Sequence, residues 1–273
     1  MTDAESAGGR PASPGVDRTL TVLEHLVESD EELTLTALAK ATRIPLATCA
    51  SIVYTLEQRG YAARRIVGRS HFWRPTLRLY GLASQLVRKM DLSQVAPREM
   101  RELADRLGMP VHMGVLDGPS VVYVAKAATP GFVQFDTYSG KIAPFNLTAL
   151  GRAIAAYLDP DELEPLLSKL APGRGPNAPK GGRKAFLGLL DHVRENGFAL
   201  EEEEEQAEIS CMAVPFFGAD GHVAGSVGVT GFARDLTEER QHDAAVGLSD
   251  LALVVSRRLD YPKESLPSAL ALS

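Results

Sequence analysis

Residues 36–60, TALAKATRIPLATCASIVYTLEQRG, join a short helical pattern to a longer one across a single proline. Thr36 is a favourable N-cap for a first helix over 37–42, and Pro45 ends that helix and can open the second. Gly60 then stops the second helix. Apolar residues at i, i+3, i+4 and i+7 of that helix form its buried stripe: Cys49, Ile52, Val53 and Leu56. The first helix is too short to be stable alone, so we expect it to pack against the second. Two helices joined by so short a turn predict a helix-turn-helix.

One helical pattern precedes this pair, and two β-type runs follow it. The preceding pattern covers 16–27 with its apolar residues on one face, and 33–35 is long enough only for a minor strand. The β-type runs, 61–66 and 71–74, flank a Val-Gly-Arg turn and indicate a hairpin. Helix, short helix, turn, helix and hairpin is the order of a winged helix-turn-helix, which we assign to 16–76.

Charge divides the chain into two parts. Residues 40–89 contain ten Lys or Arg and one acid, a net charge of +9, whereas residues 91–273 contain 17 basic and 26 acidic residues, a net charge of −9. A basic segment of this density indicates a polyanion as its partner, and a solvated basic surface is the alternative.

The outward faces of the second helix carry small and hydroxyl side chains. Small residues let a helix approach base edges in the major groove, hydroxyls can bond bases or phosphate, and arginines in the hairpin can contact the backbone. The alternative is a helix face packed against another subunit. Together with the hairpin and the charge, the pattern predicts double-stranded operator DNA as a partner. The residues expected to contact it are Arg43, Thr48, Ser51, Tyr54, Arg64, Arg65, Arg69 and Arg74.

The rest of the chain indicates a linker and a second domain. An amphipathic pattern over 77–90 predicts a linker helix, assigned to 77–92, which either pairs with its copy in a dimer or packs on its own domain. Strand pairs mixed with helices over 93–260 favour an α+β domain with an antiparallel sheet. The polar arm 1–15 and the tail 261–273 are expected to be disordered.

Asp-Gly and other Gly-containing turns separate the elements expected in that domain. The expected strands are 111–116, 120–127, 132–138, 209–217 and 222–230. The expected helices are 93–107, 148–158, 161–170, 183–196 and a last one from a Thr237 cap to about 259. The stretch 171–182, APGRGPNAPKGG, is expected to be a loop.

Composition excludes several classes of protein. No apolar run reaches the length of a membrane span, and the N-terminus lacks the apolar core of a signal peptide. The chain has two cysteines, Cys49 and Cys211, so a disulfide scaffold is not expected and a cytoplasmic location is the default. Because zinc-ligand spacing and a Gly-rich phosphate loop are both missing from the sequence, we expect neither a metal nor a cofactor.

Three stretches carry a resemblance to a known family. They are LTLTALAKATRIPLATCASIVYTLEQRGY, APFNLTALGRAIAAYL and NGFALEEEEEQAEISCMAVPFFGADGHVAGSVGVTG. In this order and spacing the chain resembles, from Val16 to Leu259, the IclR family of bacterial transcription regulators. The resemblance implies a mainly α winged helix-turn-helix, joined by a linker helix to an α+β, GAF-like effector-binding domain, in a homodimer or homotetramer.

The resemblance also implies a function. Family members bind small metabolites, often organic acids, and repression tuned by a metabolite is their commoner behaviour. By similarity, the effector pocket would be lined by Phe135, Ala143, Ala149, Leu150, Glu201, Ile209, Cys211, Gly228 and Thr230.

The sequence departs from the family pattern at two places. The family's recognition helix often has Lys-Ser near its start and His-Arg a turn later, where this chain has Leu-Ala at 46–47 and Ala-Ser at 50–51. Thr48, Ser51, Tyr54 and Arg43 are therefore expected to do more of the base reading. In the pocket, Gly228 replaces a frequent Ser, and the first acid is Glu201 rather than Asp, which predicts a roomier pocket for a bulkier or more apolar effector.

Two other functions stay open. An enzyme would use Cys211 as its nucleophile. Its base would be His112, His192 or His222, although a Cys in a β-type run is more often a packed apolar residue. A GAF-type sensor would instead act through protein contacts made by the basic region. The five glutamates at 201–205 are expected to form a solvated turn rather than a metal site, because adjacent side chains point in different directions.

Overall fold

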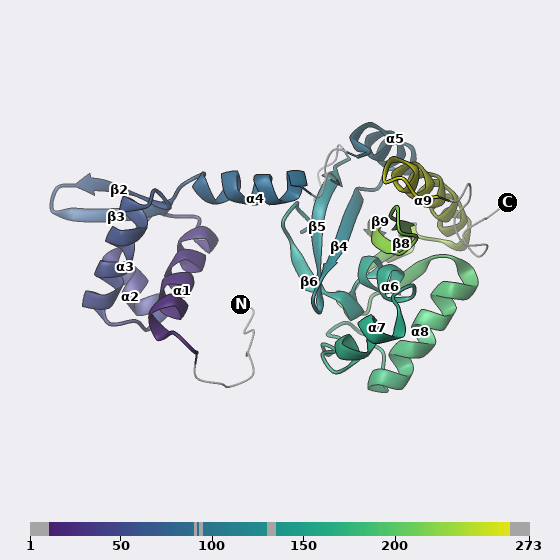
Figure 1. Cartoon of the computed structure of the whole chain (residues 1–273), viewed down its shortest axis with the longest axis horizontal. Helices are drawn as coiled ribbons and strands as arrows, with labels where there is room; N and C mark the ends of the chain where they lie inside the picture. Colours follow the sequence, from purple (N-terminus) through teal and green to yellow (C-terminus); the bar gives the residue numbers. More distant parts are fainter. Residues whose placement is uncertain (1–10, 90–91, 93–94, 130–134, 263–273) are drawn as a thin grey trace. The chain divides into compact units, whose positions relative to one another are not determined.

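A computed structural model describes residues 11–89, 92, 95–129 and 135–262 of the 273-residue chain (Figure 1). Contacts between residues divide the chain into two compact units, 1–86 and 87–273, and each unit is described by itself. Among the described residues, none of the helices combines the length and the apolar character that a lipid bilayer requires of a spanning helix.

The first unit packs helices against a small antiparallel sheet. Its elements are α1 (Pro14–Glu28), β1 (Leu33–Thr34), α2 (Leu35–Thr42), α3 (Leu46–Gln58), β2 (Ala62–Val67) and β3 (Ser70–Pro75). The strands lie in the order β1-β3-β2, and β1 pairs with β3. Strands β2 and β3 form the hairpin of the wing (Figure 1). The predicted winged helix-turn-helix is therefore confirmed.

The core of this unit joins the wing to the helices. The stripe predicted for α3 is buried, and it consists of Cys49, Ile52, Val53 and Leu56. Trp73 of β3 is 1% exposed and packs in the same cluster as Val22 and Leu26 of α1. Because a large aromatic side chain of the wing is buried among the helices, the wing is held in one position relative to α3.

The turn between α2 and α3 differs from the expectation in two details. Thr34, rather than Thr36, caps α2, because the helix already begins one residue after Thr34 and its Oγ1 accepts the N–H of Ala37 at 3.2 Å. Pro45 is the N-cap of α3 and not its first helical residue. Arg43 ends α2 in the left-handed conformation, with φ 57°, and so redirects the chain toward α3.

Helix α4 (Arg78–Lys89) follows the wing and lies within the range predicted for the linker. The boundary between the two units, at 86/87, falls inside this helix. Leu77, Tyr80 and Leu82, at and near the start of α4, are 83%, 72% and 47% exposed. This end of the helix therefore presents apolar side chains that its own unit does not cover.

The second unit is built on a six-stranded antiparallel sheet in the order β6-β5-β4-β9-β8-β7. Its strands are β4 (Val111–Asp117), β5 (Ser120–Ala127), β6 (Ile142–Pro144), β7 (Ala199–Glu202), β8 (Ile209–Phe217) and β9 (Val223–Phe232). Its helices are α5 (Pro97–Leu107), α6 (Ala149–Ala155), α7 (Pro160–Leu167), α8 (Gly182–Asn196) and α9 (Glu238–Arg258), with short 3-10 turns η2 (Phe145–Leu147) and η3 (Ala233–Asp235).

Helices cover both faces of this sheet (Figure 1). Helices α5 and α9 pack on one face, and α6 and α8 on the other. Side chains alternate along β8, so Met212 and Val214 join the α5/α9 core, whereas Ala213 joins the α6/α8 core. The predicted α+β domain is therefore confirmed, and each face of its sheet has its own hydrophobic core.

The described part of the predicted strand 132–138, residues 135–138, does not form a strand. Residues 130–134 lie outside the described residues, and the residues that follow form a tight turn in which the N–H of Thr137 donates to the carbonyl of Phe135 at 2.7 Å. A turn of this kind interrupts the extended backbone that a strand needs. The edge of the sheet is formed instead by β6, which pairs with β5.

The chain ends also differ from the expectation where they are described. Helix α1 begins at Pro14, inside the arm predicted to be disordered. Tyr261, at the start of the predicted disordered tail, is 6% exposed, and its ring lies 5.4 Å from that of Phe217 between centroids. Residues 1–10 and 263–273 lie outside the described residues.

Candidate functional site

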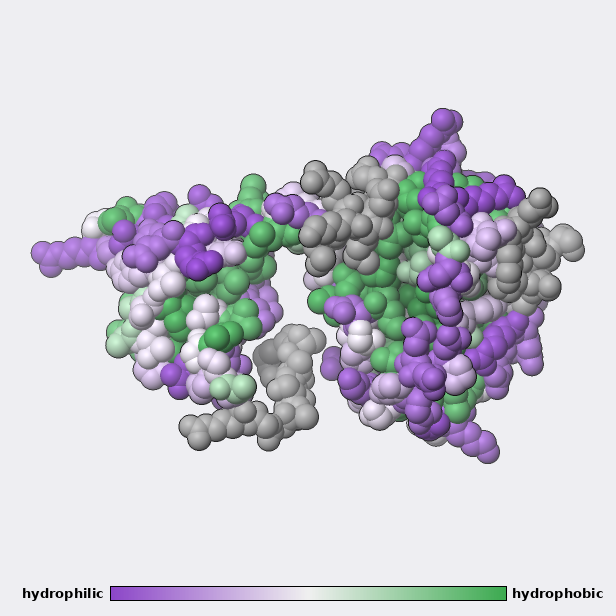
Figure 2. Space-filling view, in the orientation of Figure 1, coloured by the Kyte–Doolittle hydropathy of each residue, from purple (hydrophilic) through white to green (hydrophobic). Residues whose placement is uncertain are grey.

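The outward face of α3 presents small side chains to solvent. Ser51 and Tyr54 are exposed, Thr48 is half-buried, and Arg43 is exposed in the turn before the helix. Figure 2 shows a mostly pale surface over α3 and strongly hydrophilic side chains over the wing. A helix with this face can approach base edges closely, while the wing carries the long cationic side chains.

Acids from neighbouring elements hold three of the wing arginines. The Nε of Arg64 lies 3.3 Å from a carboxylate oxygen of Glu57 on α3. Arg65 and Arg74 share one acid, Glu32: Arg65 donates to Oε2 at 2.5 Å, and the Nε of Arg74 lies 3.7 Å from Oε1. These contacts hold the cations at defined places, and they also lower the net charge that the wing offers to a polyanion.

Tyr54 joins α3 to the wing. Its ring meets Trp73 edge-on at 5.1 Å, and the Arg64 guanidinium lies 5.3 Å from the ring centroid of Tyr54. The Tyr54 hydroxyl lies 3.5 Å from Nδ1 of His71. Tyr54 and Arg64 are thus partly engaged within the unit, whereas Arg69 at the tip is exposed and has no ion-pair partner among the described residues.

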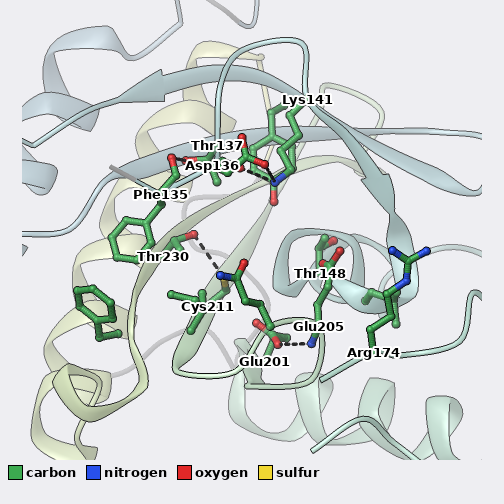
Figure 3. Close-up of a pocket in the computed structure, with 15 residues that line it drawn as sticks. Phe135, Asp136, Thr137, Lys141, Thr148, Arg174, Glu201, Glu205, Cys211 and Thr230 are labelled. Atoms are coloured by element: carbon green, nitrogen blue, oxygen red, sulfur yellow. Dashed lines mark hydrogen bonds and ion pairs between the residues drawn. The ribbon is translucent and has the colours of Figure 1, made fainter. Parts of the chain in front are cut away.

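A cavity of about 530 Å³ lies on the α6 face of the second unit (Figure 3). The cavity is lined by side chains from β5, β7, β8 and β9, and from the segments before β6 and α6. Two loops also contribute: the Pro/Gly loop (171–181) and the turn that follows β7 (203–208), which we call the acidic turn. The lining residues are Tyr123, Phe135, Asp136, Thr137, Lys141, Leu147, Thr148, Arg174, Glu201, Glu205, Gln206, Ile209, Cys211, Thr230 and Phe232.

The wall of this cavity has an apolar part and a polar part. The rings of Phe135 and Phe232 lie 5.4 Å apart between centroids at 58°, and Ile209 also lines the cavity. On the polar side, the Oγ1 of Thr230 lies 3.3 Å from the Sγ of Cys211 (Figure 3). Such a cavity suits a small molecule with an apolar body and a few polar groups.

Glu201 organises the turn at the base of the cavity. Its side chain is buried, and its Oε1 accepts the backbone N–H of Glu204 at 2.7 Å and that of Glu205 at 3.2 Å. Burial raises the pKa of the Glu201 carboxyl above its usual range, and these two backbone donors oppose the rise. Glu201 therefore keeps its proton to a higher pH than an exposed glutamate does.

A buried ion pair supports the same turn. Arg152 of α6 donates to both carboxylate oxygens of Glu204, at 2.8 and 2.5 Å. The prediction of a solvated turn is therefore wrong for Glu201 and Glu204. Both are buried: Glu201 accepts hydrogen bonds from backbone N–H groups, and Glu204 neutralises a buried guanidinium. Within the described part of the chain, we find no group of three His, Cys, Asp or Glu side chains arranged to hold a metal ion.

The thiol of Cys211 lacks the lowered pKa that a nucleophilic cysteine needs. Burial raises the pKa of its thiol to about 12, and the neighbouring Glu201 carboxylate adds to the rise. A thiol with this pKa is protonated at neutral pH and reacts poorly. His192 and His222, two of the bases considered for it, are exposed at 75% and 59% of their side chains and lie beside surface acids.

Two family models match the chain. The IclR helix-turn-helix domain matches residues 15–65, and the bacterial transcriptional regulator IclR C-terminal domain matches residues 84–257. The chain belongs to the IclR family of bacterial transcription regulators. Its first unit is the DNA-binding domain of this family, and its second unit is the effector-binding domain.

Full-length relatives share this organisation. The HTH-type transcriptional regulator KdgR of Escherichia coli (strain K12) is 28% identical over 240 residues, covering 88% of this chain and 90% of that protein. XynR of the same organism, also an HTH-type transcriptional regulator, is 28% identical over 254 residues, covering 92% of this chain and 99% of that protein. The relatives are transcription regulators, and they match nearly the whole chain.

Solved structures show the same fold at lower identity. The IclR of Thermotoga maritima superposes with a TM-score of 0.76 at 23% identity, over 90% of this chain and 98% of that one. An IclR homolog from Microbacterium hydrocarbonoxydans, crystallised with 4-hydroxybenzoate, superposes with a TM-score of 0.75 at 22% identity, over 90% of this chain and 98% of that one.

The cavity of this IclR chain contains part of the predicted pocket. The predicted residues that line it are Phe135, Glu201, Ile209, Cys211 and Thr230. The predicted residues that lie in the buried core instead of the cavity wall are Ala143, Ala149, Leu150 and Gly228.

Close packing of α6 on the sheet explains the difference. A Cβ on Gly228 would lie 2.5 Å from the carbonyl oxygen of Met212 and 3.1 Å from a methyl carbon of Leu150. The space over this glycine is already filled, so Gly228 lets α6 approach β9 and does not enlarge the cavity. The predicted roomier pocket does not follow from this position.

Several lining residues were missed by the sequence analysis. Thr148 precedes two predicted residues and caps α6 by accepting the N–H of Gly151 at 3.0 Å, so its neighbours gave a usable signal. Lys141 follows the segment 132–138, which the sequence had predicted to be a strand, so its place in the cavity wall was not expected. Arg174 belongs to a Pro/Gly loop without periodicity, and only the fold brings it to the cavity.

Proposed function

We propose that this chain is a repressor whose affinity for operator DNA is changed by a small organic acid bound in the cavity of its second unit. The observation that carries the proposal is the exposed, small-residue face of α3 beside a wing rich in arginine. These are the two parts that base reading and backbone contact require. Acting on DNA, the protein would work in the cytoplasm.

The DNA contacts divide into two kinds. Thr48 and Ser51 reach base edges from α3, and Arg43 flanks them in the turn. The wing arginines contact phosphate: Arg64, Arg65, Arg69 and Arg74. Tyr54 lies between the two groups, and its ring packing keeps α3 and the wing in register. Phosphate contacts supply affinity in this scheme, and the small face of α3 supplies sequence preference.

The cavity supports an acid with an apolar, aromatic or aliphatic body. Two phenyl rings and Ile209 offer apolar surface, and the Thr230 hydroxyl offers a polar contact. A fold neighbour, the IclR homolog from Microbacterium hydrocarbonoxydans, was crystallised with 4-hydroxybenzoate, an acid with an aromatic body. The acid would bind beside α6 and the acidic turn, which the Arg152–Glu204 ion pair holds together. Binding could therefore shift these two elements.

Self-association is part of the proposal. Exposed apolar side chains lie on α1, where Val16, Leu20 and Val27 are 58%, 51% and 54% exposed, and at the start of α4. A homodimer or homotetramer would cover such surfaces and would place two recognition helices on a two-part operator. Light scattering on the purified chain measures the assembly size.

We infer no catalytic role. The raised pKa of the Cys211 thiol argues against a nucleophile, and the relatives are regulators. A sensor that acts only through a protein partner differs from the proposal in its response to salt, because DNA binding falls with a log–log slope of about −0.9 per phosphate neutralised.

Nuclease protection tests the proposal directly. The full-length chain is incubated with the DNA upstream of its own gene, with and without candidate acids, at several salt concentrations. We expect a protected segment with two halves about one or more helical turns apart, which weakens as salt rises. Absence of any protected segment at low salt, with and without acids, contradicts the proposal.

A further inference from the structure

The Pro/Gly loop 171–181 brings a cation to the wall of the cavity (Figure 3). Arg174 lies in the middle of this loop and lines the cavity, although more than 25 positions separate it from the acidic turn. The loop has no regular secondary structure. Its position therefore depends on specific contacts.

The acidic turn holds the second half of the loop. The N–H of Gly175 donates to the carbonyl of Glu204 at 2.7 Å, and the N–H of Asn177 donates to the carbonyl of Glu203 at 3.3 Å. The side-chain amide of Asn177 donates to the carbonyl of Glu202 at 3.2 Å. Backbone of the loop and backbone of the turn thus run side by side, next to Arg174.

Asn146 holds the first half. Its Nδ2 donates to the carbonyl of Ala171 at 2.8 Å, and its Oδ1 accepts the N–H of Ala171 at 3.0 Å. The buried Asn146 backbone in turn accepts from Arg152 at 3.0 Å. The loop is therefore fixed on both sides of Arg174, at Ala171 and at Gly175 and Asn177, to the same structure that supports Glu201 and Glu204.

The glycines on either side of Arg174 make this attachment possible. A Cβ on Gly173 would lie 2.6 Å from the Cβ of Ala178, and a Cβ on Gly175 would lie 2.1 Å from the carbonyl oxygen of Glu203. A side chain at Gly175 would thus force the backbones apart. The sequence Gly-Arg-Gly therefore places a long cationic side chain where the backbone of the loop lies in close contact with the backbone of the acidic turn.

The two cations of the cavity wall differ in their partners. Lys141 already donates to the carbonyl of Asp136, and its ammonium lies 3.6 Å from the carboxylate of that residue. Arg174 takes part in no ion pair or side-chain hydrogen bond among the described residues. Arg174 is exposed, and its donors therefore remain available to a ligand.

We propose that Arg174 anchors the anionic group of the effector and that the effector is a small monocarboxylate on an apolar body. This assignment rests on the proposed function, because it names the ligand of the same cavity. The planar guanidinium can bind a carboxylate through two parallel hydrogen bonds. The carboxylate end lies at Arg174, and the apolar body faces Phe135 and Phe232.

The acids of the wall limit the charge of the ligand. Asp136, Glu201 and Glu205 line the same cavity. With Lys141 engaged by Asp136, a dianion such as a phosphate monoester gains one cation and meets the carboxylate of Glu205. A monocarboxylate needs only the one cation. Charge repulsion therefore favours monocarboxylates over dianions.

Matched acids and alcohols test the proposal. Calorimetry on the full chain measures Kd for benzoate, 4-hydroxybenzoate and hexanoate, and for benzyl alcohol, 4-hydroxybenzyl alcohol and 1-hexanol. We expect at least one acid to bind more tightly than its alcohol, and Arg174→Gln to weaken that acid about 10-fold to 100-fold while changing the alcohol about twofold or less. Lys180→Gln is the control, because Lys180 lies on the same loop and lines a different cavity.

Three results overturn the proposal. They are equal Kd values for the acid in the wild type and Arg174→Gln, alcohols that bind as tightly as their acids, and failure of every acid to bind to a wild-type chain that still binds its operator. Operator binding is measured on the same preparations. Its absence from the wild type contradicts the proposed function, whereas a lost acid preference with operator binding intact contradicts only the role of Arg174.

Discussion

Arg152 and Glu204 form a two-pronged ion pair across 52 positions of sequence, with N···O distances of 2.8 and 2.5 Å. The guanidinium is 1% exposed and the carboxylate 10% exposed. The pair joins α6 to the acidic turn, which also donates backbone N–H groups to Glu201 of β7 and accepts hydrogen bonds from the loop of Arg174. A ligand in the cavity therefore touches elements that one buried ion pair holds together.

Removing one partner of this pair should destabilise the second unit. Glu204→Gln leaves the Arg152 guanidinium buried without a counter-charge, so we expect the free energy of unfolding to fall by about 3 kcal/mol. Denaturant unfolding of the full chain measures the change. Glu202→Gln, at the exposed last residue of β7 just before the turn, should change it by about 0.5 kcal/mol or less.

The double variant separates charge from packing. Arg152→Met combined with Glu204→Met removes both charges, and we expect it to be more stable than Glu204→Gln alone, because no buried charge remains unpaired. If the double variant is less stable than the single one, the ion pair matters chiefly through its hydrogen bonds and not through charge balance.

Glu201→Gln should make stability less dependent on pH. Burial raises the pKa of Glu201 above its ordinary value of 4.5, so ionisation is harder in the folded chain than in the unfolded one. The stability that this carboxyl contributes is complete below its ordinary pKa and is lost as pH rises through its raised pKa. The amide variant should therefore gain stability over the wild type as pH rises, and should equal it in acid.

Melting temperatures across pH, measured without ligand, check this expectation. Glu202→Gln removes an exposed carboxyl from the adjacent position and provides the control. An advantage of Glu201→Gln that is the same at pH 4 and pH 8 would assign the effect to packing rather than to ionisation.

Glu32→Gln should strengthen DNA binding. Glu32 pairs with Arg65 at 2.5 Å and with Arg74 at 3.7 Å, and phosphate must compete with it for both cations. We expect affinity for any duplex to rise about threefold to tenfold at low salt, with a steeper salt dependence. Glu31→Gln makes the same charge change next to it, and Glu31 pairs with no arginine among the described residues. An equal gain from both variants would mean that only net charge matters.

The local parts of the fold could be read from the sequence, because they follow from short-range rules. The α3 stripe repeats at helical spacing, and the wing strands flank a Gly turn. The caps were less secure: Thr34 and Thr36 are both good capping residues, and only the observed start of α2 selects Thr34.

The cavity could be predicted only in part, because its wall is assembled from segments that are distant in sequence. The family resemblance predicted both Cys211 and Thr230 in the pocket, and they meet at 3.3 Å. The resemblance could not show that Leu150 covers Gly228, since that contact depends on how closely α6 packs. No sequence pattern predicted Arg174 in the cavity wall. Its loop has no helical or strand periodicity, and hydrogen bonds to the acidic turn position it.

Ser51→Ala and Arg69→Ala should affect DNA binding differently. Ser51 lies on the exposed face of α3, so its loss should change the preference between operator sequences. Arg69 lies at the tip of the wing, so its loss should weaken all sequences alike and reduce the salt slope by about 0.9. Binding to several operator variants at a series of salt concentrations measures both. A uniform loss from Ser51→Ala would place it at the phosphate backbone instead.

Gly175→Ala tests whether the position of Arg174, and not only its charge, matters to the ligand. The added Cβ would lie 2.1 Å from the carbonyl oxygen of Glu203, so the loop must move away from the turn and carry Arg174 with it. We expect the free energy of unfolding to fall by about 1–3 kcal/mol and the affinity for a bound monocarboxylate to fall with it. Gly188→Ala is the matched control, because nothing lies within 4 Å of that added Cβ in α8, and a helical alanine there should be neutral or stabilising. Unchanged acid affinity in a folded Gly175→Ala chain would show that the loop can shift without disturbing the anchor, and the close approach of the two backbones would then serve stability alone.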